Sequence, residues 1–141
     1  MVHFWVIFCR SILEQSCVLW DSSLSQENID NLERTQKSFA KLVLQSEYKS
    51  YPEAIFSLNL DNLQTRRKKL KIKFGNAGIQ NNTLTDLFPL KNKKHNMTTR
   101  CQEKYEITHS NTKRLKNSTI LNLQSLMNKE EEKKKKSYTS G

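Results

Sequence analysis

The chain has 141 residues, of which 35% are hydrophobic and 27% are charged, and its formal net charge is +10 at pH 7. This length suits one small domain, and the low hydrophobic share excludes a compact core that includes the whole chain. The charge is uneven, because residues 1–60 carry five Lys/Arg against seven Asp/Glu while residues 61–141 carry 19 against seven. A basic second half favours a polyanionic partner such as nucleic acid over the alternative of a solubilising tail.

The first predicted element is an apolar helix over residues 4–20. Its large side chains point to several sides, which is typical of a helix buried in a larger body. The segment lacks the basic start and the cleavage site of a signal peptide, and Arg10 and Glu14 interrupt any membrane span. We therefore expect no membrane partner, and we expect the chain to be a fragment whose first helix exposes aromatic surface.

Three further helices are predicted, over 25–43, over 50–58, and from Asn59 or Asp61 to 78; apolar residues repeating at helical spacing indicate the first and the third. Ser25 is the expected N-cap of the first of these. The run Ser50-Tyr51-Pro52-Glu53 predicts a capping box at the start of the second. Gly75 and Gly78 are expected to end the third.

Beyond residue 78 the chain is rich in Asn, Thr, Ser and Lys. Phe88-Pro89-Leu90 is interpreted as a short docking or turn element, and residues 115–127 as one more helix. The charge run from residue 129 to the end is expected to be disordered. The predicted fold is thus all-α: a small irregular bundle of three or four helices in domain 1–78, followed by a largely disordered basic tail, 79–141.

The sharpest local feature is a basic run in the helix over 59–78. Six of its eight residues are basic: Arg66, Arg67, Lys68, Lys69, Lys71 and Lys73. Cations without an interleaved acid repel one another on a helix, and such a surface neutralises phosphates and releases counterions. These six residues are the predicted nucleic-acid-binding site, and an ordinary solvated helix face is the alternative.

The sequence gives little support for a catalytic site or a metal site. The four aspartates are isolated in the sequence: Asp21, Asp30, Asp61 and Asp86. Paired divalent ions for polymerase or nuclease chemistry need clustered carboxylates. The set His95, Cys101 and His109 falls short of the four ligands of a structural zinc site. We expect no catalytic residue, metal, cofactor or small-molecule substrate, and so no enzyme. Three irregularly spaced cysteines also argue against a disulfide framework and favour an intracellular setting, nucleus or cytoplasm.

Several short motifs, in this order, resemble the region after the polymerase thumb in jockey-like and related non-LTR retrotransposon reverse transcriptases. They are Arg10-Ser11-Ile12-Leu13-Glu14, Val18-Leu19-Trp20, Leu32-Glu33-Arg34 with Gln36-Lys37, Phe88-Pro89-Leu90, Lys104-Tyr105, and Arg114-Leu115-Lys116-Asn117-Ser118. The resemblance extends over most of residues 10–127, although Gln15 stands where the family has tyrosine. The fingers, palm and endonuclease regions have no counterpart here.

The resemblance implies descent from an RNA-directed DNA polymerase, without its activity. In that family this region would help to hold template RNA or target DNA beside the palm and thumb. The expected function is therefore non-catalytic, sequence-independent binding of RNA or DNA by a transposable-element fragment. The alternative is a stand-alone helical protein-interaction module with a solubilising basic tail.

Overall fold

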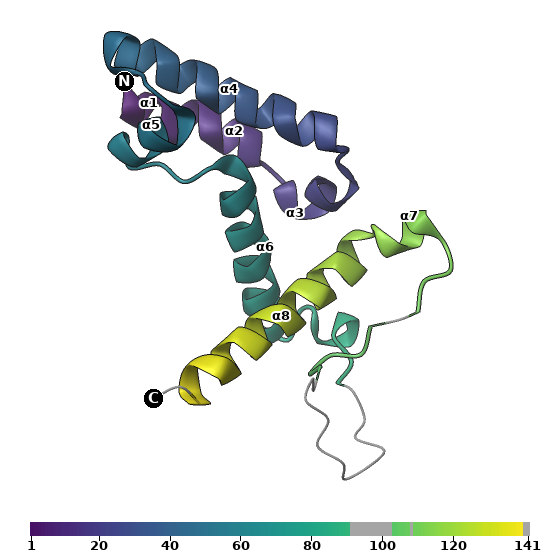
Figure 1. Ribbon diagram of the computed structural model, residues 1–141. Coiled ribbons are helices and arrows are strands. Elements are labelled where there is room, and N and C mark those ends of the chain that lie inside the picture. Colours follow the sequence, from purple (N-terminus) through teal and green to yellow (C-terminus); the bar gives the residue numbers. More distant parts are fainter. Residues whose placement is uncertain (91–102, 108, 140–141) are drawn as a thin grey trace. The chain divides into compact units, whose positions relative to one another are not determined.

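The computed structural model describes residues 1–90, 103–107 and 109–139. The chain divides into an N-terminal unit, Met1–Leu70, and a C-terminal unit, Lys71–Gly141. Apart from one isolated bridge between Leu90 and Tyr105, the regular elements of the described residues are helices (Figure 1). The predicted all-α class is confirmed. The division falls at residues 70 and 71, whereas the sequence suggested a boundary at residue 78.

The N-terminal unit opens with a continuous helical stretch. It comprises α1 (Val2–Phe4), a π-helical segment (Trp5–Cys9) and α2 (Arg10–Glu14). Ser16 then adopts a left-handed conformation with φ of 51°, which interrupts the helix. After it come α3 (Cys17–Trp20) and a 3-10 turn over Asp21–Ser23. The single predicted helix over 4–20 is therefore divided at Ser16.

Two more helices of this unit match the sequence patterns closely. Helix α4 spans Gln26–Leu44, and the Asn28 backbone N–H donates to Ser25 Oγ at 3.3 Å, which confirms the predicted cap. Helix α5 spans Tyr51–Ser57. The Ser50 side chain makes no capping hydrogen bond, so the predicted capping box is absent. A proline within the first turn supports the start of α5 in its place, because its fixed φ suits a helix.

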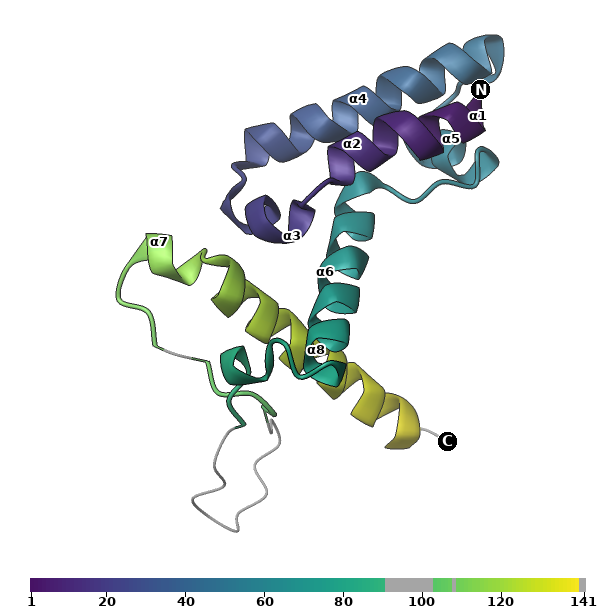
Figure 2. The same ribbon diagram turned by 180° about the vertical axis from the view of Figure 1, so that it is seen from behind.

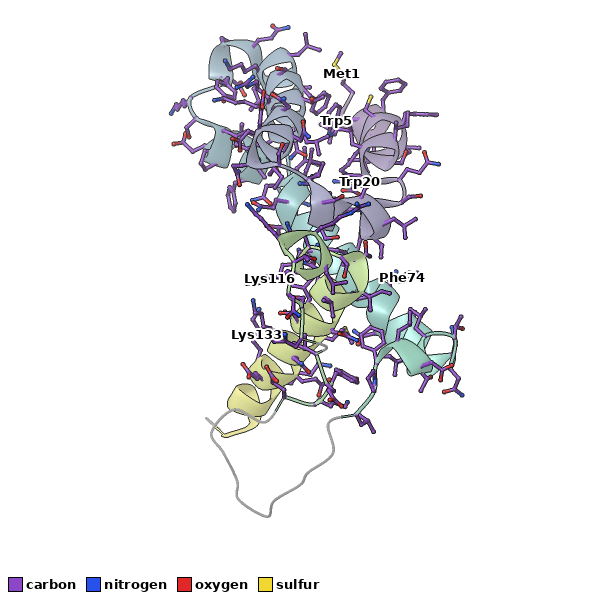
Figure 3. The ribbon with its side chains drawn as sticks, turned by 90° about the vertical axis from the view of Figure 1, so that its right-hand side faces the viewer. Met1, Trp5, Trp20, Phe74, Lys116 and Lys133 are labelled. Atoms are coloured by element: carbon purple, nitrogen blue, oxygen red, sulfur yellow. The ribbon has the colours of Figure 1, made fainter. Side chains whose placement is uncertain are left out.

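An aromatic stack joins the first helix to α4. The Trp5 and Phe39 rings lie 4.4 Å apart with an interplanar angle of 10°. Figures 1 and 2 show the N-terminal helical stretch running alongside α4, and Figure 3 shows Trp5 between the two. Trp5 is buried, as is Ala40, the residue that follows Phe39 in α4. Burying an aromatic side chain of this size contributes about 1.5–3 kcal/mol by area.

Helix α6 spans Leu63–Gln80 and continues through both glycines that were expected to end it. A Cβ at Gly75 would lie 3.0 Å from Met127 Sδ, and one at Gly78 would lie 2.3 Å from Leu84 Cδ1. The glycines therefore serve close packing inside a helix rather than its termination. This prediction was wrong because a local rule for helix ends does not include tertiary approach.

The C-terminal unit adds a 3-10 turn (Thr85–Leu87), α7 (Lys113–Lys116) and α8 (Thr119–Thr139) to the end of α6. Its core consists of four buried side chains, Phe88, Tyr105, Leu123 and Met127, with Ile72, Ile79 and Leu84 packed against them. Asn128 exchanges two hydrogen bonds with the Tyr105 backbone, at 2.9 and 3.0 Å. Phe88 is thus a docking element, as predicted.

Helix α8 is longer than the helix predicted over 115–127, and it extends across positions that were expected to be disordered. Two ion pairs, Glu130–Lys133 and Glu131–Lys134, each three residues apart, support the charged end. Such pairs stabilise a helix by a few tenths of a kcal/mol each. Acid and base blocks in succession therefore favour helix here, whereas the sequence suggested an unstructured tail.

Candidate nucleic-acid interface

Two hydrogen bonds fix the start of α6, which bears the predicted binding site. The Gln64 backbone N–H donates to Glu33 Oε1 at 2.7 Å, and the Thr65 N–H donates to Asn62 Oδ1 at 2.7 Å. These acceptors satisfy N–H groups that have no partner inside the helix. Leu63 is fully buried beside them. The basic run therefore begins from an anchored helix end.

Arg66 is held by a carboxylate from the first helix. Its guanidinium makes two hydrogen bonds to Glu14, with Nη2 at 3.0 Å from Oε2. The hydrogen bond to Glu14 raises the pKa of Arg66, despite partial burial. The Arg66 side chain keeps 30% of its surface exposed. It is available to a phosphate only in competition with Glu14.

Arg67 lies wholly inside the N-terminal unit. Its Nε donates to Asp21 Oδ1 at 2.7 Å, and its guanidinium carbon lies 5.9 Å from the centre of the Trp20 ring. The side chain is 1% exposed, and its Nη1 and Nη2 atoms make no hydrogen bond with any described residue. A buried guanidinium of this kind holds the fold together and cannot reach a phosphate.

The remaining four cations divide evenly. Lys69 Nζ lies 2.7 Å from Asp61 Oδ2, and the hydrogen bond from Lys69 lowers the pKa of Asp61. Lys71 is buried in the C-terminal unit and donates to Asn122 Oδ1 at 3.2 Å. Lys68 and Lys73 are exposed. Of the six predicted binding residues, these two alone face solvent without an ion pair to a described residue.

The partners of the basic run come from elsewhere in the sequence. The inference that its cations lack acids rested on the run alone, whereas Glu14 and Asp21 precede α6 by more than 40 residues. A signal for them existed in the excess of acidic over basic residues in the first 60 positions. This excess indicates that the first half of the chain supplies the counter-ions, but it does not indicate which cation each acid pairs with.

A second surface of the N-terminal unit is apolar. Four large side chains of the first helix are more than half exposed: Phe4, Ile7, Phe8 and Ile12. Beside them lies an open groove of about 460 Å³, lined by Ile12, Leu13, Trp20, Leu24, Asn28, Asn31, Leu32 and Thr35. Exposed apolar patches of this kind mark interaction sites. The predicted aromatic surface on the first helix is present at Phe4 and Phe8, whereas Trp5 is buried.

The carboxylates are dispersed over separate contacts. Asp21 meets Arg67, Asp61 meets Lys69, and Asp30 accepts from Gln26. Among the described residues, no three His, Cys, Asp or Glu side chains are placed to hold a metal ion. His95 and Cys101, which the sequence raised as zinc ligands, lie outside those residues.

None of the described helices alone is long and apolar enough to cross a bilayer. Only the bent pair Val2–Glu14 and Cys17–Ser23, with a 43° break, meets that test by length and composition. In comparisons with protein-family models, with curated proteins and with solved structures, nothing matches this chain.

Proposed function

We propose that this chain is a non-catalytic C-terminal segment of a non-LTR retrotransposon reverse transcriptase that binds RNA or DNA through phosphates, without sequence preference. The observation that carries the proposal is positive charge beyond what the chain neutralises itself. Residues 61–141 have 19 Lys/Arg against seven Asp/Glu, and Lys68 and Lys73 stay exposed on α6 after its other cations have found partners. The family resemblance of the short motifs supports the same function.

Binding of this kind is electrostatic. Lys and Arg reach phosphate oxygens from any sequence, whereas base edges are read by side chains held in a groove, among them Asn or Gln at adenine and Arg or Lys at guanine. No Asn or Gln lies within residues 66–73. Each phosphate contact releases counterions, so the logarithm of the affinity falls by roughly 0.7–0.9 per contact for each tenfold rise in salt.

The test is a salt titration of fluorescence anisotropy with random single-stranded RNA, single-stranded DNA and duplex probes. Replacing Lys68 and Lys73 by glutamine should weaken binding to all probes alike and reduce the salt slope by roughly 1.4–1.8 for two lost contacts. The matched control replaces Lys37 and Lys49, two exposed lysines of the N-terminal unit. Arg67 is unsuitable for this test because its loss would disturb the fold.

Binding that does not respond to salt, or equal losses in the variant and its control, would contradict the assignment to α6. The proposed origin has its own test. Genomic sequence upstream that encodes a polymerase palm, even interrupted by stops, would support it, and an unrelated reading frame would not.

The exposed apolar face of the first helix favours a second candidate, a protein-interaction module. Phe4, Ile7, Phe8 and Ile12 are 56–70% exposed, which leaves them without cover from described residues. In a polymerase the palm or thumb would cover them, and in a stand-alone module a different protein would. A chain that fails to bind any nucleic acid at low salt would favour the module.

A further inference from the structure

The C-terminal unit contains a segment in which positive charge is separated from acids. Between Glu106 and Glu130 there is no acidic residue, and the segment contains Lys113, Arg114, Lys116 and Lys129. Three of these four cations fall within the single turn of α7. The net charge of this segment is therefore positive.

The turn is held in place by its own hydrogen bonds. Thr112 caps it, since the Leu115 N–H donates to Thr112 Oγ1 at 3.2 Å and the Lys116 N–H donates to the Thr112 carbonyl at 3.0 Å. The Asn117 N–H donates to the Lys113 carbonyl at 3.1 Å. Helix α8 follows directly, and Leu121 near its start is buried. The cations of α7 are thus presented by ordered backbone.

Lys113, Arg114 and Lys116 are all exposed, and none forms an ion pair with a described residue (Lys116 is labelled in Figure 3). This differs from α6, where Arg66, Arg67 and Lys69 each meet a carboxylate. Two acids of α8 have cations of their own, Glu130 with Lys133 and Glu131 with Lys104 and Lys134. Glu130 also lies eleven residues after Thr119, about 16 Å along the helix, which exceeds the screening length of roughly 10 Å at 0.1 M salt.

We propose that Lys113, Arg114 and Lys116 form a phosphate-binding patch, here called the α7 patch, and that it is a principal contact of this chain with nucleic acid. The assignment rests on the proposed function and moves its centre away from α6. Lys113 and Lys116, three residues apart, lie on one side of the turn, where neighbouring side chains are about 5–6 Å apart at Cβ. Arg114 adds a guanidinium, whose planar fork suits two oxygens of one phosphate.

The surroundings of the patch favour nucleic acid over an anionic membrane. Residues 109–119 supply polar hydrogen-bonding groups, including Asn111, Asn117 and Ser118, of the kind that contact phosphate and sugar. The only large apolar side chain in this stretch is Leu115, at 47% exposure. Insertion into a bilayer interface needs a broad apolar face, which a single leucine does not provide.

The experiment uses the full chain and a random single-stranded RNA probe in an anisotropy titration over a range of salt concentrations. Replacing all three patch residues by glutamine should weaken binding at least about tenfold at low salt and reduce the salt slope by roughly 2.1–2.7 for three contacts. The control replaces Lys37, Lys41 and Lys49, exposed residues of the N-terminal unit, and removes the same charge. It should weaken binding by less than about threefold. A variant with Lys113→Arg and Lys116→Arg keeps the charge and should keep the affinity.

Equal losses in the patch variant and its control overturn the α7 patch while leaving nucleic-acid binding intact. A wild-type chain that binds no nucleic acid overturns the patch and the proposed function together. Binding to vesicles that contain phosphatidylserine, lost in the patch variant and unmatched by any RNA binding, also overturns the assignment. Far-ultraviolet circular dichroism of each variant should show unchanged helicity, because none of the replaced side chains is buried.

Discussion

The contact between Asp21 and Arg67 gives the sharpest test of how the N-terminal unit is held together. The Arg67 side chain is 1% exposed and the Asp21 side chain is 14% exposed, with 2.7 Å between Nε and Oδ1. Replacing Asp21 by asparagine keeps the shape and a hydrogen-bond acceptor but removes the negative charge. Replacing Arg67 by methionine removes the positive charge and keeps much of the apolar stem. The two changes differ in which charge they leave behind.

The expected costs follow from the two exposures. Asp21→Asn leaves a buried guanidinium whose Nη1 and Nη2 already have no partner among described residues. Removing one partner of a buried ion pair costs about 3–5 kcal/mol, because the other charge stays out of water. Arg67→Met leaves a carboxylate with 14% of its surface in water, so the cost should be smaller, about 1–3 kcal/mol, from the less buried charge and some lost packing. The double variant should resemble Arg67→Met more than the sum of both.

The measurement is urea unfolding followed by circular dichroism and by tryptophan fluorescence, since the Trp20 ring lies 5.9 Å from the Arg67 guanidinium carbon. The free energy of unfolding should fall furthest for Asp21→Asn and should partly recover when Arg67→Met is added. Equal losses for the two single variants, or a larger loss for Arg67→Met, would refute the claim that the guanidinium is the costly partner. Additive losses in the double variant would show that the two side chains are not coupled.

Two further predictions concern packing and pH. Gly78→Ala should destabilise the C-terminal unit by about 1–3 kcal/mol in thermal unfolding, because the new Cβ would lie 2.3 Å from Leu84 Cδ1, and a second change, Leu84→Ala, should relieve that clash. Burial, with a hydrogen bond to the carboxylate of Glu33, raises the pKa of Tyr51 well above its ordinary value of 10.0. The folded state therefore holds this proton more tightly than the unfolded state does. The resulting stabilisation is complete below about pH 10 and is lost as the pH rises beyond that value. A urea midpoint that stays constant from about pH 9 to pH 11, or that decreases equally in Tyr51→Phe, would contradict this prediction.

The helices that the sequence predicted well are those set by local chemistry. Helix α4 spans Gln26–Leu44 where periodicity predicted 25–43, and Ser25 caps it as expected. Both features depend on residues within one or two turns of each other, so a sequence window contains the whole cause. The same holds for α5, at Tyr51–Ser57, although its expected side-chain cap is replaced by proline in the first turn.

The sequence-based predictions failed where contacts with residues distant in the sequence determine the local structure. Gly75 and Gly78 satisfy every local sign of a helix end, yet Met127 and Leu84 occupy the space that a side chain would need. The burial of Tyr105 depends on Asn128, whose amide pairs with the Tyr105 backbone from 23 positions away. The polar, asparagine-rich composition of this region indicated an irregular tail, because the region has few apolar residues. The composition gave no sign that an asparagine side chain would hold a core residue in place by hydrogen bonds.

The candidate binding site shows that the position of a cation in the sequence does not reveal whether an acid neutralises it in the fold. Density of cations along the sequence selected residues 66–73, but the structure pairs Arg66 and Arg67 with carboxylates of the first 21 residues and buries Arg67 outright. A positive charge is free for a phosphate only when no acid of its own chain lies within hydrogen-bonding reach, and that condition is set by the fold. Among the described residues, three cations of the α7 patch have no such acid, whereas the denser run on α6 retains two. Distance from acids in the folded chain, more than the number of lysines in a row, therefore decides where this protein offers charge to a partner.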